Sequence, residues 1–458
     1  MGKKRRFLVN TFILTAGSAI LRFAGLWFRS VINGYIGASG IGMYQLIFSV
    51  FTLFVTACTS GIGLAVTRLV AEGRGSKECI LRCLALALSL SVGAAAALAL
   101  GADFIAARFL GSAAAASSLR ILACGLPFIA TCACLKGYFF ANRNTAVPIL
   151  GEFWEQGVTM AVSIALLQSS PLPPLDALML GSTSGEVAAV LYIVPLFLRY
   201  TRKNGMPCGE GKVLRVIIHI AGPMLAGSFL RNGLFSAENV LIPVGLEKNG
   251  AGGVAALAQY GVMQGMVMPI LTFPLSLLSS AAALLIPEIA EATARGDPAA
   301  VRRPAEKAFR FTLLFGFPTA AVFIAFSDEL GMLLFGSAQA GQILRIMAPL
   351  APLMYLDNVV DNLLKGLDQQ MFSLGYNLSD ALMRVFLIWL LIPVFGIRAY
   401  LVILFASEIY NASLSIGRLL KVTELRVDII DWILTPAVLG GLVFYGLMLA
   451  KKAALLFH

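Results

Sequence analysis

Apolar runs of about 20 residues, the length of a membrane-spanning helix, recur along the whole chain between short polar links. The pattern predicts a bundle of transmembrane α-helices, with no loop long enough to hold a separate soluble domain. The predicted spans cover residues 10–36, 41–66, 82–102, 119–141, 147–168, 176–198, 216–245, 254–286, 308–327, 343–364, 372–393, 399–419 and 432–450.

The composition agrees with this interpretation, because 59% of the 458 residues are hydrophobic and only 13% are charged. The net charge of +11 would indicate nucleic acid as a partner of a soluble protein. Here the basic residues fall mainly in alternate loops, as the positive-inside rule requires. The basic segment 3–6 therefore predicts a cytoplasmic N-terminus, and no nucleic-acid partner is expected.

The two halves of the chain resemble each other. Leu21-Arg22 recurs as Leu230-Arg231, and Leu135-Lys136-Gly137 recurs as Leu364-Lys365-Gly366. Six helices per half give both halves the same orientation, so they are expected to be parallel repeats. The predicted fold is an all-α integral membrane protein with two six-helix lobes, related by a pseudo-twofold axis around a central cavity, plus about one extra helix. The predicted domains are 1–205 (N-lobe), 206–426 (C-lobe) and 427–458 (additional helix).

Two arginines interrupt the first apolar run. Arg22 and Arg29 are seven residues apart, which places them on one face of a helix. An arginine at bilayer depth costs about 2.5–3.5 kcal/mol and usually faces a bundle interior or a water-filled cavity. We therefore expect an internal site for an anion. The alternative is a structural role, with the side chains reaching the membrane surface or forming internal ion pairs.

The stretch from Leu21-Arg22 to Met43-Tyr44-Gln45 resembles the multidrug/oligosaccharidyl-lipid/polysaccharide (MOP) exporter superfamily, as does the segment 60–72. The pattern is most similar to the stage V sporulation protein B and polysaccharide-transport branch, close to MurJ-type lipid II flippases. The segment 136–141 resembles a fourth-helix motif of that branch, but Lys136 replaces its usual arginine. The resemblance implies a monomeric flippase in the bacterial cytoplasmic membrane, which moves a lipid-linked saccharide outward by alternating access.

The resemblance also implies which residues bind substrate. Arg22 and Arg29 correspond to a first-helix arginine pair that lines the cavity of MurJ-type members. The diphosphate of a lipid-linked sugar suits the guanidinium group. The predicted substrate-binding set is completed by Arg231, Arg68, and two carboxylates that share a face of the fifth helix, Glu152 and Glu155.

Some MurJ-type proteins resemble sodium-coupled transporters, with an ion site in the second lobe. The residues of this chain that come nearest to such a site are Glu238, Asn239, Asn377 and Asp380. The coupling ion is left open between sodium and a proton, and no other cofactor is expected. A structural ion pair of Asp380 with Arg384, four residues later, is the competing interpretation.

Three other functions compete with the flippase. A cation-coupled multidrug extruder has the same fold, but its cationic drugs favour a cavity poor in arginine. A membrane glycosyltransferase would need a large outer loop with catalytic residues, so we expect no enzyme. A scaffold that does not transport is the third alternative. Seven cysteines and two histidines show no metal-binding spacing, and we interpret the cysteines as packing residues.

Overall fold

The computed structural model describes residues 3–71, 77–142, 144–204, 213–295, 298–425 and 428–456. These residues form helices and short connections, with no strand among them, so the predicted all-α class is confirmed. The chain divides into two compact units, Met1–Val240 and Leu241–His458, here called unit 1 and unit 2. Their boundary lies inside one helix. The predicted domain ranges follow the sequence repeat instead, and they stay a prediction.

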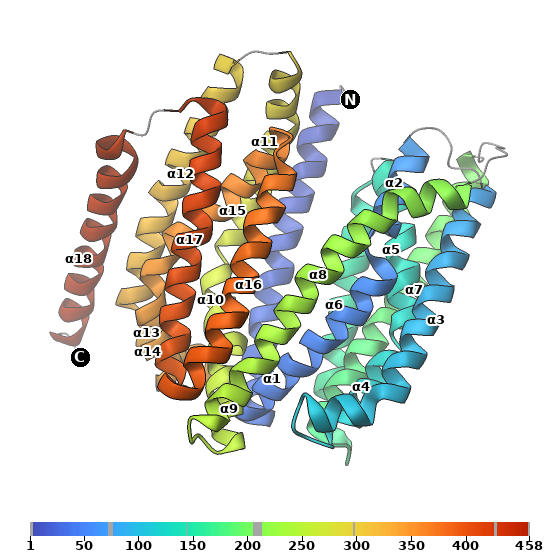
Figure 1. The fold of residues 1–458 in the computed structure, drawn as a ribbon, viewed down its shortest axis with the longest axis horizontal. Helices are drawn as coiled ribbons and strands as arrows, with labels where there is room; N and C mark the ends of the chain where they lie inside the picture. The colour runs from blue at the N-terminus through green and yellow to red at the C-terminus, as the bar shows by residue number, and fades with distance from the viewer. Residues whose placement is uncertain are drawn as a thin grey trace. The chain divides into compact units, whose positions relative to one another are not determined.

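Unit 1 begins with a very long helix. The predicted gap between residues 36 and 41 is not a loop, because the first two predicted spans join directly across a kink at Gly37. Gly37 has φ 64° and ψ −178°, a conformation open mainly to glycine. The helices of unit 1 (Figure 1) are α1 (Lys3–Thr59), α2 (Ile62–Ala71), α3 (Lys77–Arg108), α4 (Ala115–Ala123), α5 (Leu126–Ala141), α6 (Ala146–Ser169), α7 (Pro174–Asn204) and the first part of α8 (Val213–Lys248).

Unit 2 begins with the end of α8. It contains one short helix that the hydrophobic pattern did not predict, α13, which follows the end of α12. The remaining helices of unit 2 are α9 (Gly253–Tyr260), η1 (Gly261–Val267), α10 (Met268–Thr272), α11 (Leu275–Ala294), α12 (Pro298–Ala325), α13 (Ser327–Phe335), α14 (Ala338–Met347), η2 (Ala348–Leu350), α15 (Ala351–Gly366), α16 (Gln370–Phe395), α17 (Ile397–Thr423), η3 (Ile430–Leu434) and α18 (Thr435–Leu456).

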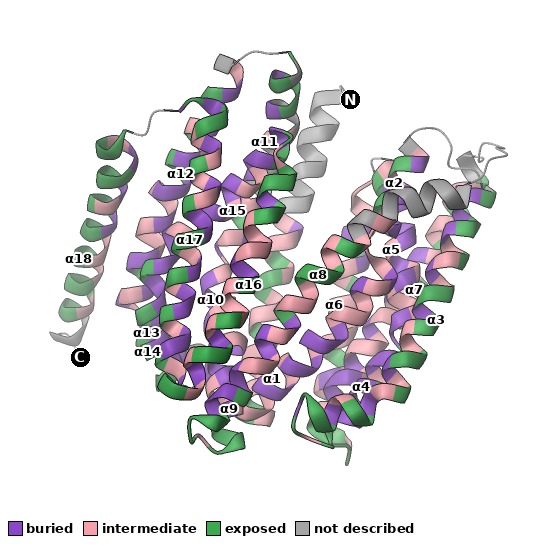
Figure 2. Cartoon of the chain, in the orientation of Figure 1, coloured by how far each residue is buried: buried purple, intermediate pink, exposed green. Residues whose placement is uncertain are grey.

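Nine helices among the described residues are long and apolar enough to cross a membrane, or ten if α4 and α5, bent by 41°, count as one span. Figure 2 shows exposed residues along the outer faces of helices such as α3 and α18. Many of these residues are large and apolar, including Leu100 (85% exposed) and Trp389 (60% exposed). Such side chains would be unfavourable in water over so much of the surface, and they suit a hydrocarbon environment.

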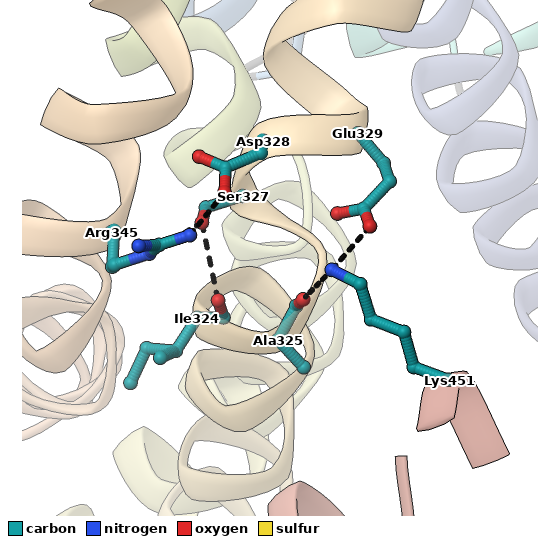
Figure 3. A network of polar contacts seen from close by, with 7 residues as sticks. All are labelled: Ile324, Ala325, Ser327, Asp328, Glu329, Arg345 and Lys451. Carbon is teal, nitrogen blue, oxygen red and sulfur yellow. Dashed lines mark hydrogen bonds and ion pairs between the residues drawn. The ribbon is translucent and has the colours of Figure 1, made fainter. Parts of the chain in front are cut away.

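The C-terminal helix α18 packs on α12 and is fixed at both ends. Just before its start, in η3, both carboxylate oxygens of Asp431 contact Arg310 of α12, each at 3.1 Å. Near its end, Lys451 pairs with Glu329 of α13 and donates to the backbone oxygen of Ala325 at 3.5 Å (Figure 3). The predicted additional C-terminal helix is thus present, and it belongs to unit 2.

Glycines allow the closest helix contacts in unit 1. A Cβ at Gly137 of α5 would lie 2.4 Å from the backbone oxygen of Gly63 on α2. A Cβ at Gly185 of α7 would lie 2.6 Å from the backbone oxygen of Glu155 on α6 and still closer to Thr159. Small residues permit such approaches between membrane helices. The second contact fixes how α6 and α7 face each other, and so positions Glu155.

Candidate functional site

The two arginines predicted on the first helix lie on α1, before its kink. Arg22 is exposed, and among the described residues it has no hydrogen-bond or ion-pair partner. Arg29 is half-buried and lies near the side chain of Tyr44. Gln156 of α6 donates to the backbone oxygen of Leu21 at 3.0 Å. This bond fixes α1 against α6 immediately beside Arg22.

The other two predicted arginines are exposed at different places in unit 1. Arg68 lies in the last turn of α2, and Arg231 lies on α8. The residue after Arg231, Asn232, donates to the hydroxyl of Thr56 on α1 at 2.6 Å, and Ser236 donates to the backbone oxygen of Ser49 at 2.6 Å. These bonds attach α8 to the second half of α1. The role of the arginines in substrate binding stays a prediction.

A cluster of charges lies between α5, α6 and α7, and we call it the unit 1 polar centre: Lys136, Glu152, Glu155 and Glu186. The Lys136 ammonium lies 3.6 Å from Oε1 of Glu152 and 3.5 Å from Oε2 of Glu155. Glu186 of α7 interacts electrostatically with both Glu155 and Lys136. The two carboxylates predicted to bind substrate are therefore ion-paired within the protein. The sequence singled out Lys136 as part of the internal repeat and as a departure from a motif, but not as the partner of these carboxylates.

A second cluster lies between α15, α16 and α17, and we call it the unit 2 polar centre. Its charged members are Asp357, Asp361, Asp380, Arg384 and Glu408, and its neutral members are Ser373, Asn377, Ser407 and Asn411. Asp361 accepts from Ser373 at 2.6 Å and from Asn377 at 3.0 Å. Asp380 accepts from Ser407 at 2.5 Å and pairs with Arg384 at 3.4 Å.

The unit 2 polar centre contains buried oxygen atoms without partners. Asn411 donates to Oδ2 of Asp357 at 2.9 Å and to Oδ1 of Asn377 at 3.3 Å. Asp357 and Asn411 are only 8% and 6% exposed, yet within the part of the chain that the structure describes Oδ1 of each meets no hydrogen-bond donor. A buried acceptor without a donor is unfavourable. These two oxygens are therefore suited to a cation or a proton.

The four residues predicted to bind a coupling cation fall into both units. Asn377 and Asp380 lie in the unit 2 polar centre. Glu238 and Asn239 belong to unit 1, where each is 2% exposed on α8. Asn239 donates to the backbone oxygen of Phe235 at 2.8 Å. The four-residue site stays a prediction. Among the described residues, no three His, Cys, Asp or Glu side chains converge as metal ligands.

The contacts show how the internal repeat aligns. In unit 1, Arg120 of α4 pairs with Asp103 of α3 at 2.5 Å. In unit 2, Arg345 of α14 pairs with Asp328 of α13, and in both pairs the partners are 17 residues apart. The second pair follows the first by 225 residues. Pro352, in the first turn of α15, follows Pro127, in the first turn of α5, by the same spacing. The sequence around the arginines, Leu119-Arg120-Ile121 and Leu344-Arg345-Ile346, repeats with the same spacing.

These helices, with charged clusters inside them, have the fold of MATE transporters. An inward-facing multidrug resistance MATE family transporter of the MOP superfamily superposes with a TM-score of 0.71 and 13% identity, over 89% of this chain and 100% of that chain. A MOP superfamily transporter from Pyrococcus furiosus, for which a reverse polarity of the binding pocket was taken to suggest a different function, superposes with a TM-score of 0.63. That pair is 14% identical over 97% and 95% of the two chains. The fold class predicted from the sequence is confirmed.

Residues 7–293 match the family described as Polysaccharide biosynthesis protein, and residues 249–390 match the family described as MatE. Because the first match covers more than half of the chain, this protein belongs to the polysaccharide biosynthesis protein family, within the MOP superfamily of membrane transporters. Stage V sporulation protein B of Bacillus subtilis (strain 168) is 26% identical over 455 residues, 95% of this chain and 88% of that protein. Sporulation protein YkvU of the same organism is 21% identical over 373 residues, 75% and 79% of the two chains.

Proposed function

We propose that this transporter moves a lipid-linked cell-envelope saccharide, such as lipid II or an undecaprenyl-diphosphate oligosaccharide, from the cytoplasmic to the outer leaflet by alternating access. The observation that carries the proposal is Arg22, which lies inside the membrane-spanning part of α1 and has no partner among the described residues. An arginine without a partner at this depth is expensive, and such residues usually serve a substrate pathway.

The chemistry of the proposed substrate fits this arginine. A diphosphate presents several charged oxygens to the guanidinium group, which binds two of them at once. Glu152 and Glu155 are paired with Lys136, so these carboxylates do not compete with the diphosphate for Arg22. The membrane potential favours the outward movement by roughly 2.3 kcal/mol per negative charge and 100 mV.

Native mass spectrometry of the purified protein tests this function. Wild type should retain lipid II or undecaprenyl-diphosphate saccharides, and Arg22→Ala should lose them, with Arg22→Lys between the two. Arg82→Ala is the matched control, because Arg82 is exposed on α3 and pairs with Glu78 of its own helix. Equal binding by wild type and Arg22→Ala would contradict the proposal.

We further propose that transport is coupled to a monovalent cation, sodium or a proton, held in the unit 2 polar centre. The residues that would hold it are Asp357, Asn411 and Asn377, which bring carboxylate and amide oxygens together from three helices. The two buried oxygens without donors support this assignment. Asp357→Asn should abolish a sodium-dependent rise in the melting temperature. A response to pH but not to sodium would instead assign a proton.

An acidic polar centre in each unit also suits the alternative function, a cation-coupled multidrug antiporter. The two functions differ in their substrates. Cationic drugs that bind more tightly after Arg22→Ala, together with no binding of diphosphate lipids, would favour the antiporter.

A further inference from the structure

The internal repeat relates the two polar centres residue by residue. The spacing of 225 residues that relates the pairs Asp103–Arg120 and Asp328–Arg345 also relates the two centres. Lys136 corresponds to Asp361, Glu152 to Asn377 and Glu155 to Asp380. The contact of Lys136 with Glu152 joins residues 16 apart, and so does the contact of Asp361 with Asn377. The two polar centres are therefore built on equivalent helices by equivalent contacts.

The third helix of each centre corresponds at a spacing of 222 residues, three fewer than in the other two helices. On α7, Gly185 touches the backbone of Glu155, and on α17, Ser407 donates to Asp380. Gly185 and Ser407 are equivalent when α7 and α17 are aligned, and the next residue in each helix is a glutamate, Glu186 or Glu408.

The centres differ in where their basic residue lies. Unit 2 has Arg384, paired with Asp380, where unit 1 has Thr159. Unit 1 has the cation Lys136 where unit 2 has the anion Asp361. The ammonium lies near two carboxylates in unit 1. In unit 2 the described donors to Asp357 and Asp361 are the neutral side chains of Ser373, Asn377, Asn411 and Ser415.

We propose that Lys136 is a tethered cation: its ammonium permanently occupies, in unit 1, the place that a free monovalent cation takes in the equivalent polar centre of unit 2. This inference rests on the cation proposed above for unit 2. Buried carboxylates need a compensating positive charge, and a lysine supplies it without an ion that must bind and leave. Unit 1 would then be fixed in one charge state, and only unit 2 would respond to the ion gradient.

Removing the lysine should create a new ion site. Binding of ²²Na⁺ to the purified full chain is measured in choline buffer of constant ionic strength. Wild type should bind one sodium ion per chain, and Asp357→Asn none. Lys136→Ala, which leaves room beside Glu152 and Glu155, should bind two, and Lys136→Ala combined with Asp357→Asn should bind one. Lys136→Arg keeps the positive charge and should behave as wild type.

The variants separate the two proposals. Wild type could bind one ion that Asp357→Asn loses, while Lys136→Ala binds no additional ion. That result would overturn the tethered cation but keep the ion in unit 2. If wild type binds no ion but Lys136→Ala combined with Asp357→Asn binds one, the ion in unit 2 is overturned and the tethered cation is kept. If Lys136→Ala does not fold in choline, its recovery in folded form in sodium chloride supports the proposal. Equal loss of folded protein in both salts contradicts it.

Discussion

The ammonium of Lys136 lies 3.5 Å from the carboxylate of Glu155, across the contact between α5 and α6. Both side chains are largely enclosed, with 20% and 28% of their surfaces exposed. Glu152 and Glu186 add two further carboxylates to the same place. Lys136 therefore supplies a positive charge beside three carboxylates in the interior of unit 1.

Removing Lys136 should destabilise the protein more than removing the charge of Glu155. Lys136→Met leaves three carboxylates without their ammonium, and loss of one partner of a buried pair costs about 3–5 kcal/mol. Glu155→Gln leaves the ammonium paired with Glu152. Thermal unfolding in a sodium-free buffer compares the two variants. A smaller effect of Lys136→Met than of Glu155→Gln would contradict the assigned pairing.

Gly137→Ala should disrupt the contact between α5 and α2. The added Cβ would lie 2.4 Å from the backbone oxygen of Gly63, so one helix has to move. Overpacking of this kind costs about 1–3 kcal/mol. Gly157→Ala on α6 is the control, since its Cβ would meet no atom within 4 Å. Similar melting temperatures for the two variants would show that this close approach does not exist.

The ion pair of Glu329 with Lys451 should make the attachment of α18 depend on pH. The hydrogen bond from Lys451 lowers the pKa of the Glu329 carboxyl from its usual 4.5. A carboxyl whose pKa is lower in the folded state stabilises the fold at pH values above its pKa in the unfolded chain. This contribution to stability disappears as the pH falls through the folded-state pKa. The melting temperature of wild type should therefore exceed that of Glu329→Gln at about pH 6, with the difference vanishing in acid. In a Lys451→Met background this difference should become smaller, because only the backbone hydrogen bond of Glu329 and Arg345 would still lower the pKa of its carboxyl.

The two equivalent ion pairs, Arg120 with Asp103 and Arg345 with Asp328, should differ in strength. Arg120 contacts Asp103, and both side chains are at least half exposed, so Arg120→Ala should cost at most about 1 kcal/mol. Arg345 contacts Asp328 and also donates to the buried hydroxyl of Ser327 at 3.0 Å. Arg345→Ala should cost more, because it also removes this bond. The melting temperatures of the two variants test this order.

The hydrophobic pattern was sufficient to predict the class of fold and most helices, because bilayer thickness sets the length of an apolar run. It missed α13, which is too short to produce such a run. It also predicted a gap near residue 37, where a single glycine with positive φ turns the helix without a loop. Neither feature depends on hydrophobicity, so the pattern could not reveal it.

The polar centres were only partly accessible from the sequence. Glu152 and Glu155 were recognised as sharing a face, but their partner Lys136 lies on another helix. Which residues meet depends on how the helices are rotated, and close contacts such as that of Gly185 determine the rotation. The repeat was also aligned differently, since the sequence matched Lys136 with Lys365, whereas the contacts match Lys136 with Asp361, about one helical turn earlier.

The most direct test of the proposed function is transport by the protein reconstituted into vesicles. A fluorescent undecaprenyl-diphosphate saccharide is placed in one leaflet, and its appearance in the other is followed by quenching. Wild type should transfer the lipid and Arg22→Ala should not, while Arg82→Ala transfers it normally. No transfer of any diphosphate lipid by wild type, together with cation-dependent efflux of a drug, would contradict the flippase and establish the antiporter.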